Sequence, residues 1–178
     1  SGEMDVKAAA FKDGKMLGKV SGKKLYGNLI SGKSFTVTPP IGAAKGDIFG
    51  ENDVLGTDIS TFGLTNGKRG NIASMTPWSG FRMNDACNKL VFIVEFEQPT
   101  TVSKVVFGSL YNPASVILPP SVATVETSSD GRKYDKMAEA SFKRNYPERG
   151  RKAFTDTLGF APKEVKYIKI TLQNGGTL

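Results

Sequence analysis

Apolar and polar residues alternate along most of this chain with a period of two, and the helical period is nearly absent. Short alternating or apolar runs are separated by Gly, Pro, Asn and Asp, the residues that favour turns. This pattern predicts an all-β protein built as a sandwich or a barrel, with no helix of regular length.

The N-terminal part of the chain predicts a small β-hairpin. Residues 4–11 alternate as in a strand, Asp13-Gly14 favours a tight turn, and a second strand should run to about Val20. Residues 22–32 are rich in Gly and Lys, which is typical of a linker. We therefore expect residues 1–30 to be separate from a main domain at residues 31–178.

In the main domain, the strongest strand signal lies at residues 90–96. Apolar side chains occupy both of its faces, as in a central strand that is covered on both sides. A turn is predicted next at Gln98-Pro99, and a loop at residues 110–120. Further strands are predicted at residues 34–38, 102–108, 122–128, 133–142, 151–158 and 165–172. Together they suggest a jelly-roll sandwich.

The absence of histidine narrows the possible chemistry. It excludes Ser-His-Asp and Cys-His catalysis, imidazole acid–base chemistry and ordinary zinc sites. Carboxylate catalysis remains possible, but Glu95, Glu97 and Glu126 fall on predicted strand faces without a clear partner. The single cysteine, Cys87, cannot form an internal disulfide and fits a buried apolar position.

The net charge of +7 raises the question of an acidic partner. The lysines and arginines are scattered and mostly alternate with apolar residues, as on solvated strand faces. No stacking motif with interleaved basic residues appears, so a nucleic-acid partner is not expected. Near Tyr146, the basic residues form either an anion-binding patch or a solvated loop; they are Lys143, Arg144, Arg149 and Arg151. No apolar run is long enough to insert in a membrane.

Several motifs follow one another in an informative order. A Gly-rich loop with Leu64-Thr65-Asn66-Gly67 precedes Trp78 and Gly80-Phe81; the strand at 90–96 and the hairpin motif Ser128-Ser129-Asp130-Gly131 come later. This order resembles the coagulation factor 5/8 type C, or discoidin, domain. The nearest version is the family 32 carbohydrate-binding module of bacterial glycoside hydrolases. The resemblance implies a galactose-binding-like β-sandwich.

Residues 6–15 resemble the end of a chitobiase-type C-terminal domain. Such a domain precedes the module in family 20 β-N-acetylhexosaminidases, especially those of Bacteroides-like bacteria. The resemblance implies a non-catalytic, C-terminal piece of a larger hydrolase that is secreted, periplasmic or on the cell surface. Its catalytic domain would lie upstream in the same polypeptide, and the start at Ser1-Gly2-Glu3 fits a segment from within a protein.

Sugar recognition needs an aromatic face for the ring, with fork donors and amides for the hydroxyls. The predicted loops offer Trp78, Phe81, Arg82, Asn84, Tyr111 and Asn112 for an N-acetylhexosamine or galactose-type glycan. Core packing for the first two, a salt bridge for the arginine and a simple turn at Tyr111-Asn112 are open alternatives.

The resemblance also suggests a structural calcium at Asn66 and Asn71, held there without charge. The histidine that such modules often use to hold a sugar is missing. A structural spacer or docking domain with no sugar ligand is therefore the alternative function.

Overall fold

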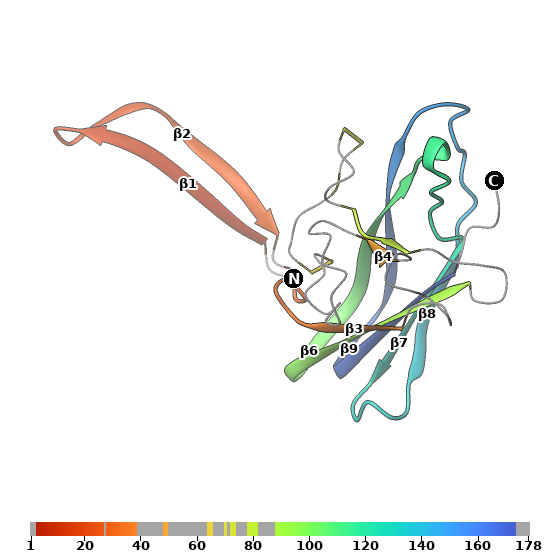
Figure 1. The fold of residues 1–178 in the computed structure, drawn as a ribbon. Helices are drawn as coiled ribbons and strands as arrows, with labels where there is room; N and C mark the ends of the chain where they lie inside the picture. Colours follow the sequence, from red (N-terminus) through yellow and green to blue (C-terminus); the bar gives the residue numbers. More distant parts are fainter. Residues whose placement is uncertain are drawn as a thin grey trace. The chain divides into compact units, whose positions relative to one another are not determined.

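The computed structural model describes most of the chain, in these ranges: residues 3–26, 28–38, 48–49, 64–65, 70, 72–73, 78–81 and 88–173. The chain divides into two compact units, Ser1–Gly32 and Lys33–Leu178. Within the described ranges, β-strands make up the regular structure apart from one short 3-10 turn, η3 (Pro113–Ser115) (Figure 1). No helix in these ranges is long and apolar enough to cross a membrane.

The first unit is the predicted hairpin, made of β1 (Glu3–Lys12) and β2 (Lys15–Tyr26). Asp13 and Gly14 join the strands with φ of 49° and 74°, the left-handed pair that a tight hairpin turn requires. The second strand continues past its predicted end to Tyr26, because it keeps pairing with β1. The first part of the predicted linker is therefore strand. The assignment of residues 1–30 to an upstream chitobiase-type domain stays a prediction.

The second unit contains a five-stranded antiparallel sheet in the order β3-β6-β9-β7-β8. Its strands are β3 (Phe35–Thr38), β6 (Lys89–Tyr111), β7 (Val122–Ser128), β8 (Asp135–Ser141) and β9 (Lys152–Gln173). The two long strands, β6 and β9, pair with each other from Lys89–Gln173 to Tyr111–Lys152. This β6–β9 ribbon runs through the whole unit in Figure 1.

The predicted turn at Gln98-Pro99 is wrong, because β6 is a single bent strand. Its ladder with β9 passes from the Glu95–Tyr167 pair to the Thr100–Val165 pair, so β6 carries the extra residues of a bulge. Bulges bend a strand, and a proline, which has no N–H to donate to a ladder, is tolerated there. β9 is likewise a single strand, so the predicted strands 151–158 and 165–172 are two parts of it.

The core lies on the face of the sheet that the alternation predicts. Leu90, Val94 and Ile168 are between 3% and 4% exposed, and Val125 of β7 is fully buried. A second, two-stranded sheet is formed by β4 (Ile48–Phe49) and β5 (Gly80–Phe81).

This small sheet packs against the apolar face of the large one. The ring of Phe81 meets the ring of Phe92 edge to face, with 5.8 Å between the centroids. Phe92 faces the same side as Leu90 and Val94, because alternate residues of a strand share a face. Two antiparallel sheets therefore enclose the core, and the predicted fold class, an all-β sandwich, is confirmed.

The turn between β7 and β8 is built by the Ser-x-Asp-Gly motif. Ser128 Oγ accepts hydrogen bonds from the backbone N–H groups of Asp130 and Gly131 and donates one to the Asp130 carboxylate. That carboxylate also accepts from the N–H groups of Arg132 and Lys133, at 2.8 and 3.1 Å. These backbone donors, followed by Ser128, hold the pKa of Asp130 below its ordinary value.

Asp130→Asn should make the free energy of unfolding less dependent on pH in acid. The lowered pKa means that the ionised carboxylate stabilises the folded state above its ordinary pKa, and that this stabilisation is lost as the pH falls through the folded-state pKa. The wild type should therefore be more stable than the variant at about pH 7, and the gap should shrink toward about pH 3. Urea denaturation at several pH values measures this gap.

Glu148→Gln is the matched control, because it removes an exposed carboxylate from a loop rather than from the turn. A gap between wild type and Asp130→Asn that stays constant across the acid range would contradict the role given to the carboxylate.

Candidate functional site

Four of the predicted ligand residues lie outside the described residues: Arg82, Asn84, Asn66 and Asn71. Their roles toward a sugar or a calcium ion stay predictions. Within the part of the chain that the structure describes, no three acidic, histidine or cysteine side chains gather in a way that would hold a metal ion.

The two aromatic residues predicted from the loop before β6 are both engaged in packing. The indole of Trp78 lies so close to Gly70 that a methyl group there would overlap it, and its far edge lies over Gly108 of β6. Phe81 packs on the core ring of Phe92. These are the packing contacts that the sequence left open as an alternative, and a sugar-binding role for either ring stays a prediction.

Tyr111 ends β6 and is only 5% exposed. Because side chains alternate along a strand, Tyr111 faces the side of the ribbon opposite to position 108. Trp78 lies over position 108, so the structure places Trp78 and Tyr111 on opposite faces of the ribbon. They do not line a common surface.

Asn112 is 3% exposed and closes the short loop that follows β6. Its backbone exchanges two hydrogen bonds with Ile117, both of 3.0 Å, and its side-chain amide donates to Ser115 Oγ. Val116, which precedes Ile117 in this loop, has a left-handed φ of 54° and is 74% exposed. A β-branched residue is strained in this conformation, and such strain is frequent at functional sites.

An aromatic cluster lies beside this loop. The ring of Tyr146 stacks on the ring of Tyr111, with 4.4 Å between the centroids and 19° between the planes. Phe154 of β9 meets Tyr146 edge-on at 6.1 Å. Tyr146 is 37% exposed, in contrast to the buried Tyr111 beneath it. We call Tyr111, Tyr146 and Phe154 the Tyr146 platform.

The segment that carries Tyr146 is anchored by a buried ion pair. The guanidinium of Arg144 binds both carboxylate oxygens of Asp156, at 2.6 and 3.2 Å, and donates to the carbonyl of Pro120. It lies between the rings of Phe142 and Phe154, at 4.7 and 4.6 Å from their centroids. The Arg144 and Asp156 side chains are 5% and 10% exposed.

Both sequence interpretations of Arg144 are therefore wrong, since it lies neither on a solvated loop nor in an anion-binding patch. The ion pair could not be read from the sequence, because Arg144 lies in the loop before β9, Asp156 lies within β9, and no local spacing signals the pairing. The pair holds the backbone two residues before Tyr146 against β9. The platform is consequently positioned before any ligand arrives.

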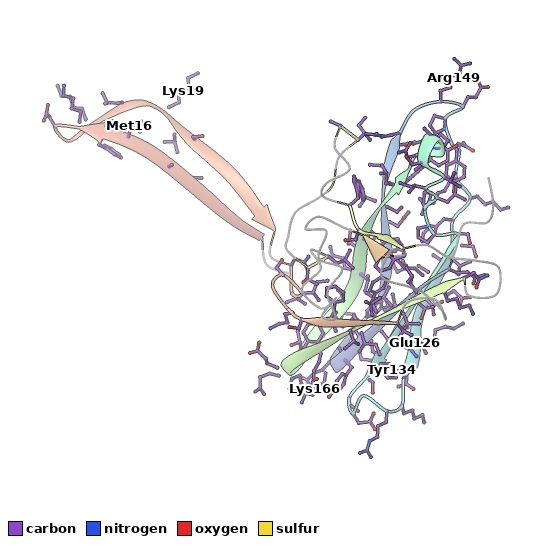
Figure 2. The ribbon with its side chains drawn as sticks, in the orientation of Figure 1. Met16, Lys19, Glu126, Tyr134, Arg149 and Lys166 are labelled. Carbon is purple, nitrogen blue, oxygen red and sulfur yellow. The ribbon has the colours of Figure 1, made fainter. Side chains whose placement is uncertain are left out.

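A second group of polar side chains lies on the face of the five-stranded sheet opposite to the core, because Glu126 alternates with the buried Val125 and Thr127 of β7. Figure 2 labels Glu126 and Tyr134 of this group. Lys169 binds Glu126 at 2.8 Å and lies 4.4 Å from the centre of the Tyr134 ring. Tyr167 donates to the Glu95 carboxylate, which raises the pKa of Tyr167, while burial raises the pKa of Tyr134. These groups bind one another across strands and stabilise the sheet face.

No protein-family model and no curated protein sequence matches the chain. The chain is similar to a Bacteroides thetaiotaomicron structure whose description proposes an α-L-fucosidase, with 14% identity and a TM-score of 0.48 over 85% of this chain and 26% of that one. It thus spans about a quarter of that protein.

Two further solved structures are similar to the chain. One is a family 32 carbohydrate-binding module from Clostridium perfringens, in complex with GalNAc-β-1,3-galactose, at 16% identity and a TM-score of 0.42 over 79% of this chain and 85% of that one. The other is the C-terminal domain of a chitobiase from Bacteroides fragilis, at 17% identity and a TM-score of 0.38 over 65% and 70%.

Asp156→Ala should lower the free energy of unfolding by about 3 kcal/mol, because it leaves the Arg144 charge buried against two rings without a carboxylate partner. Replacing both residues, as in Arg144→Met with Asp156→Ala, should recover part of this loss. Urea denaturation of the full chain measures both effects.

Asp135→Ala serves as the control, since it breaks the ion pair with Lys163, whose side chains are 62% and 40% exposed. It should cost less than about 1 kcal/mol. Equal losses for the two aspartate variants would show that burial does not set the strength of the Arg144 pair.

Proposed function

We propose that this chain is a non-catalytic carbohydrate-binding module of a glycoside hydrolase, with the Tyr146 platform as its sugar-contacting surface. The observation that carries the proposal is an exposed tyrosine ring stacked at 4.4 Å on a buried one. The apolar C–H face of a sugar packs on such a ring. A ring that is already immobilised loses little entropy when the sugar binds.

Polar groups for the sugar hydroxyls stand next to the platform. Lys152 lies 5.1 Å from the centre of the Phe154 ring and donates to the backbone carbonyl of Asn145 at 3.2 Å. An ammonium group has three donors, so two remain for a ligand. The exposed side chain of Asn145 adds an amide that both donates and accepts. This combination of ring, ammonium and amide suits a sugar.

The order of motifs supports a finer proposal about the parent protein. It would be a β-N-acetylhexosaminidase-like enzyme of a Bacteroides-like bacterium, with its catalytic domain upstream in the same polypeptide. The protein would be secreted, periplasmic or on the cell surface, and the glycan would be of the N-acetylhexosamine or galactose type. A structural calcium at Asn66 and Asn71 belongs to the same proposal.

Tyr146→Ala should weaken glycan binding by about tenfold or more, because it removes the exposed ring but leaves the Arg144 anchor intact. Tyr146→Trp should retain binding, since it keeps an aromatic face. A glycan array of N-acetylhexosamine and galactose-containing sugars would identify a ligand, and isothermal titration would give the affinities.

Tyr134→Ala is the matched control, because it removes a tyrosine from the other polar cluster and should leave the affinity unchanged. A folded wild type that binds no sugar on the array would overturn the proposal and favour the spacer. Equal affinities for wild type and Tyr146→Ala would place the sugar elsewhere.

A further inference from the structure

The loop that carries Tyr146 is rich in exposed positive charge. Residues 143–152 expose two lysines and two arginines but only one carboxylate, Glu148. The exposed cations are Lys143, Arg149, Arg151 and Lys152, and Figure 2 labels Arg149 at the end of the unit where the loop enters β9. We call these four residues the basic rim.

The basic rim has no carboxylate partner among the residues that the structure describes. Within the described ranges, Arg151 and Lys152 donate to backbone carbonyls, those of Ile72 and Asn145. Elsewhere among the described residues of the unit, Lys89, Lys104 and Lys133 are exposed and lie singly on β6 and in the turn before β8, while five other lysines are paired with carboxylates. These pairs are Lys33–Glu97, Lys136–Glu139, Lys163–Asp135, Lys166–Glu95 and Lys169–Glu126.

The clustering of unpaired cations determines the electrostatic potential around this loop. Unpaired like charges on one short loop repel each other, and the resulting positive field attracts anions. The rim is also adjacent to the platform, since Lys152 and Tyr146 contact the same Phe154 ring. The field is therefore concentrated where an aromatic face is available.

We propose that the ligand of the Tyr146 platform is an anionic glycan, whose sugar bears a carboxylate or a sulfate ester that the basic rim binds. This inference rests on the proposed function and narrows its ligand class. Arg149 presents a planar fork that matches the paired oxygens of either anion, and Lys152 adds a point charge beside the ring. The sugar ring stacks on Tyr146 while its anionic group faces the cations.

A nucleic acid is the competing anionic polymer. Single-stranded nucleic acids are held by successive aromatic side chains, each stacking one base, along a basic groove. Among the described residues of this loop, Tyr146 is the one exposed aromatic ring, since Phe142 at its start packs on Phe107. One ring with a surrounding rim suits a single sugar unit better than a run of bases.

The test uses the full chain and isothermal titration with four probes of similar length. These are an oligogalacturonate, which carries only carboxylates, a κ-carrageenan oligosaccharide, which carries only sulfate esters, a neutral galacto-oligosaccharide and an oligothymidylate. The first two separate a carboxylate from a sulfate as the preferred anion. At least one of them should bind about tenfold more tightly than the neutral sugar, and its affinity should fall as NaCl rises from about 50 to about 300 mM.

The variant Lys143→Ala with Arg149→Ala should weaken binding of the anionic sugar by about tenfold and leave binding of the neutral sugar unchanged. Lys89→Ala with Lys104→Ala is the charge-matched control, because both lysines are exposed on β6, outside the 143–152 loop. This control should retain the affinity of the wild type.

The outcomes separate this inference from the proposed function. If neutral and anionic sugars bind equally and Tyr146→Ala weakens both, the anionic ligand is wrong and the sugar site stands. If no sugar binds a folded chain, both are wrong. If the oligothymidylate binds as tightly as the anionic sugars and with the same dependence on the rim, the partner is a nucleic acid and the inference is overturned.

Discussion

The pairing of β6 with β9 is the constraint on which the second unit depends. One part of this ribbon forms the centre of the five-stranded sheet, with Leu90, Val94 and Ile168 on the core face. The other part brings Tyr111 and Phe154 to one face of the ribbon, where Tyr146 packs on them. A shift of the register by one residue would turn every side chain of a strand to the other face. Core and platform are therefore fixed by the same ladder.

Alternation and turn residues were sufficient to predict where most strands lie and which faces they bury. The strand at 122–128 and the Asp13-Gly14 and Asp130-Gly131 turns follow from local rules. The sequence could not show that β6 passes through Gln98-Pro99, because the same dipeptide serves a turn and a bulge. Tyr111, one of the predicted sugar ligands, is buried as the support of Tyr146, and no local pattern encodes this contact between residues far apart in the sequence.

Phe154 connects the stability of the fold to the candidate site. Its ring contacts the guanidinium of Arg144, the ammonium of Lys152 and the ring of Tyr146. Arg144 is buried and paired with Asp156, so it stabilises the fold. The exposed cations of the basic rim remain available to a ligand. Arg144 and the cations of the basic rim thus have different roles although they lie in the same segment. Burial and the presence of a carboxylate partner, rather than residue type, distinguish them.

The long ribbon also has a consequence for biosynthesis. Because Lys89 pairs with Gln173, and Tyr111 with Lys152, the central ladder joins segments that are far apart in the sequence. Pairings of this kind form slowly, because the chain loses the entropy of closing a large loop before any contact stabilises it. On the ribosome, β6 has to wait for nearly all of the unit to emerge before its main partner exists. Its apolar face is exposed during that interval, and exposed apolar surface makes a folding chain prone to aggregate.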